Sequence, residues 1–242
     1  MLLATIGGMA LLLLLIDRDQ ALAMIAVFGT VAGLLFLVYR IRDVPRRDAY
    51  RDAARVLGLR HEGSDTRGLV NLPHPLLHRS AEIRDIGHVL SGLWHGSDVV
   101  VFEYRYMTGA SAQGQGVAHE YSCVLTPVPV SWPDLIVEPE RMPTRTTDVL
   151  GLRDIDVEYE EFNRAFEVRS ADPRFASAFL DARMMAWLMD SVSGYGFEIV
   201  HHRLLVFGPR VAPWEVGSVL ATTETFLAQV PPVIDSMYPA PP

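Results

Sequence analysis

The chain has 242 residues, 50% of them hydrophobic, and a formal net charge of −8 at pH 7. All 21 basic residues are arginines, which excludes lysine-based chemistry such as Schiff-base formation, and an acidic chain without a basic stripe argues against nucleic-acid binding. The one cysteine, Cys123, excludes an intramolecular disulfide and a multi-cysteine zinc site.

Two uncharged apolar segments open the chain. Met1–Ile16 carries no charged side chain, and Ala21–Tyr39 is uncharged over 19 residues. As a helix the second segment would be roughly 28 Å long, about the thickness of one hydrocarbon core. The pattern predicts a transmembrane helical hairpin over residues 1–40. A cleaved signal peptide is the alternative for the first segment, but a basic n-region and a small-residue cleavage site are missing.

Arginines beside these segments predict the orientation. The second segment is followed by four of them: Arg40, Arg42, Arg46 and Arg47. Because positive charge stays on the cytoplasmic side, we expect an integral protein of the bacterial inner membrane whose C-terminal domain is cytoplasmic. The same arginines are candidates for contacts with the anionic headgroups of the lipid bilayer, worth about 1 kcal/mol each. The alternative is that they act only as a topology signal.

Gly29 and Gly33 form a G-x-x-x-G pattern in the second segment. Small residues let membrane helices approach closely, because lipid supplies no hydrophobic force between helices. We favour packing between the two predicted helices, with formation of a homo-oligomer as the alternative.

Residues 41–62 are expected to form a juxtamembrane linker with one amphipathic helix. The helix is predicted over Arg46–Leu57, and Gly58 follows as a stop signal. Its apolar face would comprise Ala49, Ala53, Val56 and Leu57. A proline-containing loop is predicted over Gly63–Arg79.

Alternating apolar and polar residues then predict three strands, at residues 86–94, 98–107 and 117–125. Their short links are typical of an antiparallel meander. A short strand is predicted at Leu135–Val137 and another at Ala165–Arg169.

Helices and strands alternate in the last third of the chain. Asp172 and Pro173 are typical of a helix start, and the apolar stripe continues to Asp190. Residues 197–207 predict one strand or a tight hairpin, and Pro213 opens the last helix. We therefore expect an α+β fold in which a transmembrane hairpin precedes a mainly antiparallel sheet domain with two packed helices over residues 63–238, and a disordered tail at residues 239–242.

The stretch from Asp154 to Leu188 carries a recognisable pattern, in which an E-F-x-x-x-F-x-V strand that begins at Glu161 precedes a helix ending in M-x-x-L. These 35 residues resemble a widespread group of uncharacterised bacterial membrane-anchored proteins of unknown function. The resemblance implies a fold and an anchor but no activity, so it transfers no catalytic residue.

No pattern in the chain predicts a catalytic, cofactor-binding or metal site. His74 and His78 have the i,i+4 spacing of metal ligands on a helix, but prolines interrupt the run. His201 and His202 are adjacent, and a strand would point them to opposite faces. His119 and Cys123 would lie roughly 13 Å apart along one strand, which favours a core role for both.

Carboxylates crowd the segment from residue 154 to residue 161, at Asp154, Asp156, Glu158, Glu160 and Glu161. The run lacks the residue order and the glycine of an EF-hand. A solvated face is the favoured interpretation, and a divalent-cation site is the alternative. The glycine-rich segment Gly109–Gly116 lies between strands, where no helix follows to bind a phosphate.

The favoured function is a non-catalytic interaction module, or an accessory subunit of a bacterial membrane complex. The alternative is an enzyme or ligand-binding domain that acts on a lipid or envelope precursor at the inner leaflet. It predicts that several scattered side chains converge in a pocket: His61, His88, His119, Glu103 and Glu120. The sequence supplies no ligand, partner or pathway.

Overall fold

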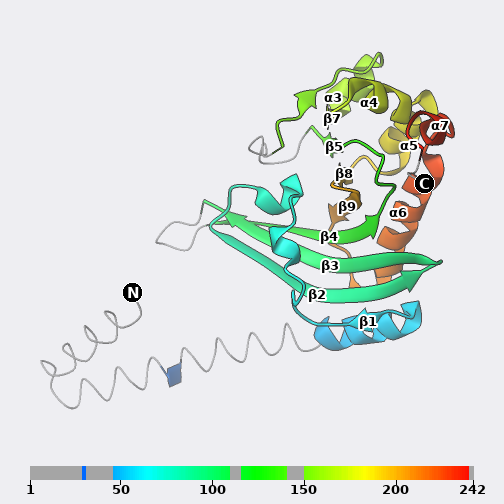
Figure 1. Ribbon diagram of the computed structural model, residues 1–242. Helices are drawn as coiled ribbons and strands as arrows, with labels where there is room; N and C mark the ends of the chain where they lie inside the picture. Colours follow the sequence, from blue (N-terminus) through cyan, green and yellow to red (C-terminus); the bar gives the residue numbers. More distant parts are fainter. Residues whose placement is uncertain (1–28, 31–45, 110–115, 141–149, 240–242) are drawn as a thin grey trace, which may run out of the picture. The chain divides into compact units, whose positions relative to one another are not determined.

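The computed structural model describes residues 29–30, 46–109, 116–140 and 150–239. The chain divides into two compact units, Met1–Asp48 and Ala49–Pro242. Nearly all described residues belong to the second unit, which holds a sheet and the helices packed on it (Figure 1).

The structure contradicts the prediction of a transmembrane hairpin. None of the helices among the described residues is long and apolar enough to cross a membrane. The prediction relied on segment length and hydropathy, which are necessary for spanning but do not show that a continuous helix forms. Of the segments concerned, residues 1–28 and 31–40 lie outside the described residues, and Gly29 is an exposed helical residue.

The domain is built on one nine-stranded sheet, in which every pair of neighbours is antiparallel. The strand order is β1-β2-β3-β4-β9-β8-β5-β7-β6. The strands are β1 (Arg60–His61), β2 (Ile83–Trp94), β3 (Ser97–Thr108), β4 (Val117–Pro127), β5 (Leu135–Pro139), β6 (Arg153–Asp154), β7 (Phe166–Ser170), β8 (Gly196–Val200) and β9 (Arg203–Pro209). The mainly antiparallel sheet was predicted, whereas the joining of all nine strands into one sheet was not.

The long meander β2–β3–β4 confirms the three strands expected from alternation. Tyr104 of β3 lies opposite Ile86 on one side and Tyr121 on the other. A turn at His95 and Gly96, both with positive φ, joins β2 to β3. This geometry is the mirror-image turn that two-residue hairpins favour.

Helices cover one face of the sheet. They are the helix of residues 46–57, α3 (Glu160–Ala165), α4 (Pro173–Phe179), α5 (Ala182–Ser191), α6 (Val216–Gln229), which follows the 3-10 turn η3 (Pro213–Glu215), and α7 (Val233–Met237). The expectation of two packed helices was therefore too low. The stripe from residue 173 to residue 190 breaks into α4 and α5, because the Asp181 carboxylate caps a new helix by accepting a hydrogen bond from the Met184 N–H, at 2.8 Å.

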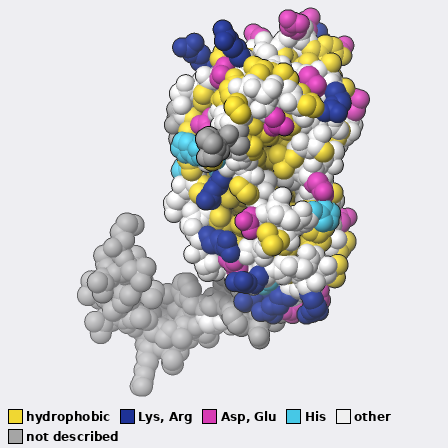
Figure 2. Space-filling view, turned by 45° about the vertical axis from the view of Figure 1, so that its right-hand side comes forward, with side chains coloured by type: hydrophobic (Ala, Val, Ile, Leu, Met, Phe, Trp, Pro, Cys, Tyr) yellow, Lys and Arg dark blue, Asp and Glu magenta, His cyan; other side chains and the backbone are white. Residues whose placement is uncertain are grey.

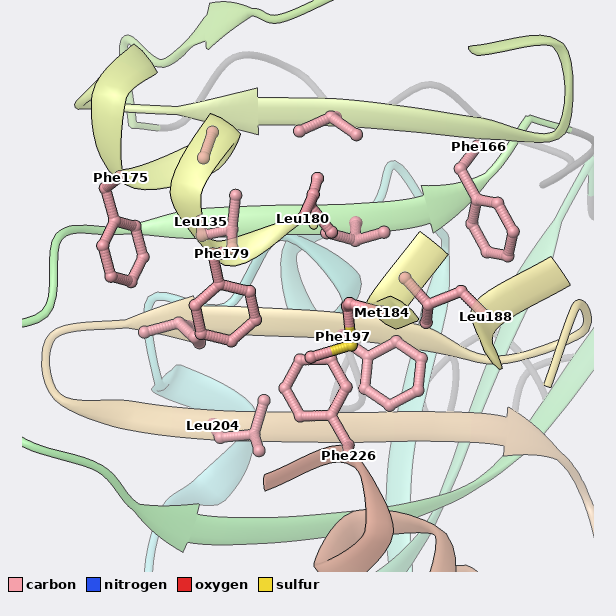
Figure 3. Close-up of a cluster of buried hydrophobic side chains, with 14 of the residues drawn as sticks. Leu135, Phe166, Phe175, Phe179, Leu180, Met184, Leu188, Phe197, Leu204 and Phe226 are labelled. Carbon is pink, nitrogen blue, oxygen red and sulfur yellow. The ribbon is translucent and has the colours of Figure 1, made fainter. Parts of the chain in front are cut away.

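Aromatic side chains fill the core between these helices and the sheet (Figure 3). Phe197 of β8 stacks on Phe226 of α6 with ring centroids 4.2 Å apart. Phe162 stacks on Phe166 at 5.0 Å, and both are fully buried. Each buried phenylalanine contributes about 1.5–3 kcal/mol. The E-F-x-x-x-F-x-V pattern is thus part of the core.

The apolar face expected for the helix of residues 46–57 is confirmed in part, since Ala53 is buried and Leu57 packs against the core. Tyr50 and Ala54 join the core beneath it, whereas Val56 is 86% exposed. The sequence pattern placed Val56 inward because it counts apolarity alone, and the large amphipathic Tyr50 was left out of the count.

The opposite face of the sheet is covered by the segment predicted as a loop. It forms two 3-10 turns, η1 (Leu69–Asn71) and η2 (Pro75–His78). Leu76 and Leu77 are fully buried against strand residues such as Phe102, Tyr104 and Phe207. The second core explains why β3 is buried on both faces.

Candidate functional site

Four of the five side chains expected to converge do lie close together. Glu103 of β3 is the centre of this group, which we call the Glu103 cluster (Tyr50, His61, His88, Glu103, Glu120 and Arg210). His88 stands at an irregularity of β2, between Gly87 and Leu90, where it adopts a positive φ of 52°. Such bulges re-aim a side chain, and strained backbone is commonest at functional sites.

Both carboxylate oxygens of Glu103 are engaged by fixed donors. Tyr50 Oη donates to Oε1 at 2.8 Å, while Arg210 donates from Nε to Oε1 at 2.9 Å and from Nη2 to Oε2 at 3.1 Å. Arg210 Nη1 also donates to Glu120 at 2.7 Å. Burial lowers the pKa of Arg210, but the bonds and charges of Glu103 and Glu120 outweigh burial and raise this pKa above its ordinary value.

Histidines complete the Glu103 cluster. The His88 ring stacks on Tyr50 with centroids 4.5 Å apart, and its Nε2 lies 3.7 Å from Glu103 Oε2. The His61 ring lies 6.4 Å from that of His88. A general base needs a carboxylate or imidazole open to substrate, whereas Glu103 is held by Arg210 and Tyr50. The cluster joins the helix of residues 46–57 to the sheet through Tyr50 and Glu103.

The fifth residue, His119, lies on the other face. It stacks on Tyr106 with centroids 4.7 Å apart and lies 3.2 Å from Thr108 Oγ1. Burial lowers the pKa of His119. Cys123 is fully buried, and burial raises the pKa of its thiol well above the ordinary value. Cys123 belongs to the core, as the sequence favoured, whereas His119 is only half-buried.

A second polar group is enclosed beneath the turn η2. Glu138 of β5 and Glu198 of β8 are almost fully buried together with Arg79, which is 0% exposed. Arg79 Nη2 lies 2.9 Å from Glu138 Oε2, and the backbone N–H of Leu76 donates to Glu198 Oε1 at 2.8 Å. Burial raises the pKa of each carboxyl to about 7. We call these three residues and His74 the buried ionic group.

His74 reaches the same carboxylate from the start of η2. Its Nδ1 lies 3.3 Å from Glu198 Oε2, yet burial lowers the pKa of His74 to about 3. The imidazole is therefore neutral at physiological pH, and the contact is not an ion pair. His78 lies 2.8 Å from the Leu72 carbonyl through Nε2. The two histidines therefore contact different partners.

The other singled-out residues stand apart from these groups. His201 and His202 form the turn between β8 and β9 with φ of 45° and 66°, so the prediction that they lie in a strand on opposite faces is wrong. The tight hairpin, one of the two alternatives predicted for residues 197–207, is confirmed. Its turn was not placed at the histidines, because a two-residue hairpin loop normally carries Asn or Gly. The acidic residues from 154 to 161 are exposed, as a solvated face requires.

Several predicted positions are only partly within the structure. Arg46 and Arg47 lie at the start of the helix of residues 46–57. Gly33, Arg40, Arg42 and residues 110–115 of the glycine-rich segment lie outside the described residues. Their proposed roles in headgroup contact and orientation stay predictions. In the described part of the chain, no group of three or more His, Cys, Asp or Glu side chains could hold a metal ion.

No sequence pattern predicted the cavity that has the size of a ligand pocket. A cavity of about 480 Å³ opens where β2 and β4 end and where β3 and β9 begin. Three arginines line it: Arg60, Arg67 and Arg203. We call it the arginine cavity. Arg60 and Arg67 lie close in the sequence, but Arg203 is far from both, so no local spacing could have joined the three. Figure 2 shows several basic side chains together at the lower end of the visible face, the end where β1 lies in Figure 1.

Comparison with known proteins gives one result at the level of fold. No family model and no curated protein matches the chain. Among solved structures, the crystal structure of the mycobacterial trehalose monomycolate transport factor A, TtfA, is similar, with a TM-score of 0.53 and 13% sequence identity. The likeness covers 77% of this chain and 97% of TtfA. The two proteins share a fold over almost all of the TtfA chain.

Proposed function

We propose that this chain is a non-catalytic accessory module of a bacterial membrane complex that handles envelope lipids. The observation that carries the proposal is the fold, which matches 97% of the chain of TtfA, a trehalose monomycolate transport factor. Association with the inner membrane through partner subunits is part of the proposal. A lipid that differs from trehalose monomycolate is compatible with it, because 13% identity conserves architecture and not a binding surface.

The polar interior supports a role without catalysis. Among the described residues, charged side chains gather in the Glu103 cluster and in the buried ionic group, and both contain internal ion pairs. The enzyme alternative predicts that His61, His88, His119, Glu103 and Glu120 converge in a pocket. The carboxylates of the Glu103 cluster face Arg210 instead.

Exposed apolar side chains supply candidate contacts with a partner. Trp214 of η3 is 78% exposed, and tryptophan is one of the residue types enriched at protein–protein interfaces. Val56 of the helix of residues 46–57 is also open to solvent. A partner that covers Trp214 would gain its large apolar surface at small entropic cost.

Isolation of the tagged full chain from native membranes under mild detergent tests the proposal. We expect other membrane subunits to co-purify in fixed ratio, and Trp214→Ala to reduce their recovery several-fold. Val130→Ala, at an exposed valine, is the matched control and should leave recovery unchanged. Recovery of the chain alone, in a strain whose envelope lipids are unaffected by its deletion, would refute the proposal.

A further inference from the structure

The arginine cavity gathers side chains from three separate parts of the fold. Arg60 comes from β1, Arg67 from the connection between β1 and η1, and Arg203 from the first position of β9. Three guanidinium groups around one cavity are unexpected in a chain whose net charge is −8. The carboxylate on the lining is Asp98, so cationic groups outnumber anionic ones there.

Arg67 is fixed in place by its neighbours. Its Nε donates to Glu62 at 3.0 Å and its Nη2 donates to Glu62 and to Ser91 Oγ, which lies 2.9 Å away. Hydrogen bonding to Arg67 lowers the pKa of Glu62 to about 2. These bonds use Nε and Nη2, so that among the described residues the N–H groups of Nη1 remain for a ligand.

The connection that carries Arg67 is itself ordered by local bonds. The Asp65 carboxylate accepts hydrogen bonds from the backbone N–H groups of Arg67, Leu69 and Val70, at 3.2, 2.8 and 3.0 Å. Such side-chain to backbone bonds hold a turn in one conformation. A preformed turn lowers the entropy that ligand binding would cost.

Arg60 and Arg203 supply the charge that is not neutralised. Within the described part of the chain, neither forms an ion pair, and both are exposed to solvent at the cavity. Lone guanidinium groups that face one space favour an anion, and phosphate oxygens match the guanidinium fork in geometry.

The rest of the lining is partly apolar. Val100 of β3 and Leu125 of β4 are register partners that point to the same face of the sheet, and they form the floor. Gly92 has a φ of 155°, and a Cβ there would come 3.1 Å from Leu59 Cδ2, so a larger residue would disturb the wall. A volume of about 480 Å³ lies in the range of small-molecule pockets and is too large for a phosphate ion alone.

We propose that the arginine cavity binds a phosphate ester, with the phosphate held by Arg60, Arg67 and Arg203 and the esterified group lying over the floor at Val100 and Leu125. This binding is independent of the accessory role proposed above, because it needs no partner protein. The ester can belong to a lipid headgroup or to a soluble metabolite, which share the same chemistry.

Calorimetric titration of the purified full chain with glycerol 3-phosphate tests the site. We expect saturable binding that weakens with added salt and at least tenfold in Arg60→Gln/Arg203→Gln. Arg174→Gln, at an exposed arginine away from the cavity, is the matched control and should bind as the unaltered chain does. Circular dichroism shows whether each variant is folded, and Arg60→Gln alone serves if the double variant is not.

Two further titrations complete the test. Glycerol should not bind, and inorganic phosphate should bind more weakly than the ester, because it leaves the floor empty. Vesicles with and without phosphatidylglycerol distinguish the sources: loss of vesicle retention in the double variant indicates a lipid headgroup, and unchanged retention with weakened glycerol 3-phosphate binding indicates a soluble ester. Absence of glycerol 3-phosphate binding at millimolar concentration, or binding unaltered in the folded variants, would overturn the proposal.

Discussion

Arg79 and Glu138 form an ion pair in the interior of the protein, with Arg79 Nη2 2.9 Å from Glu138 Oε2 and with side chains 0% and 5% exposed. The arginine comes from the segment after η2, and the glutamate from β5. Arg169 of β7 lies 3.6 Å from the same oxygen. The pair therefore links the segment that covers the second core to strand β5 of the sheet.

Replacement of Arg79 by methionine should destabilise the fold strongly. The substitution removes the shortest ion pair of the buried Glu138 carboxylate, and the loss of one partner of a buried pair costs about 3–5 kcal/mol. Urea unfolding followed by tryptophan fluorescence measures the change. Arg174→Met, at an exposed arginine, should stay within about 0.5 kcal/mol. A loss below about 1 kcal/mol for Arg79→Met would show that Glu138 is satisfied without it.

Stability should depend on pH through Glu198. Burial raises its pKa to about 7 from an ordinary 4.5, so between these values the folded state holds a proton that the unfolded state has released. The stabilising contribution is complete below pH 4.5 and falls as the pH rises towards 7, by no more than about 1.4 kcal/mol per pH unit. Glu198→Gln cannot titrate, and its amide oxygen can still accept from the Leu76 N–H.

Unfolding of Glu198→Gln and of the unaltered chain at pH 5, 6 and 7.5 isolates this effect. The variant should gain stability relative to the unaltered chain as the pH rises. His74 gives the opposite slope, since its pKa of about 3 in the fold means that stability falls as the pH drops below 6.5. His74→Gln should remove that slope, and a stability difference for Glu198→Gln that is constant with pH would contradict the assignment.

Loss of the Tyr50 hydroxyl tests the Glu103 cluster as a fastening of the helix of residues 46–57. Tyr50→Phe removes a buried hydrogen bond of 2.8 Å to a carboxylate, and bonds to charged groups contribute about 1.5–3 kcal/mol. Tyr159→Phe is the matched control, because its hydroxyl makes the same bond, also at 2.8 Å, to the exposed Glu161. Hydrogen exchange should speed up in the helix for Tyr50→Phe alone. Equal effects of both variants would rule out a role for burial.

Local sequence patterns predicted the meander β2–β3–β4 but not how the remaining strands pair or which segment covers them. Alternation over β3 is a property of consecutive residues, and so is the cap at Asp172, whose carboxylate accepts from the Arg174 N–H at 2.9 Å as predicted. The insertion of β5 between β7 and β8 depends on pairing across long stretches of chain, which no local period encodes. Glu138 and Glu198 stand in these strands at positions that a pattern rule assigns to solvent, because the cover at η2 is irregular.

The candidate site failed prediction for the same reason. Arg60, Arg67 and Arg203 are joined only when β9 pairs with β4, and the register brings Arg203 opposite Pro127 at the cavity. By contrast, His88, Glu103 and Glu120 were singled out as scattered polar groups in strands. Their convergence was predicted by the enzyme alternative, whereas the hydrogen bonds from Arg210 to Glu103 were not predicted.

The turn between β8 and β9 stores strain that a glycine should release. His201 and His202 hold φ of 45° and 66°, and a residue with a Cβ costs about 1–2 kcal/mol in this region. Their backbone groups are bonded, since the His201 N–H donates to Asp134 at 2.9 Å and the Val128 N–H donates to the His202 carbonyl at 3.0 Å. These bonds survive any side-chain change.

His202→Gly should therefore raise the free energy of unfolding by about 0.5 to 1 kcal/mol, after part of the gain is offset by the greater freedom of glycine in the unfolded chain. Thermal and urea unfolding measure the gain. Gly96→Ala, in the equivalent turn between β2 and β3 with φ of 89°, is the converse control and should lose about 1 kcal/mol. Destabilisation by His202→Gly, with Gly96→Ala behaving as expected, would mean that the exposed imidazole of His202 makes a stabilising contact that outweighs the backbone strain.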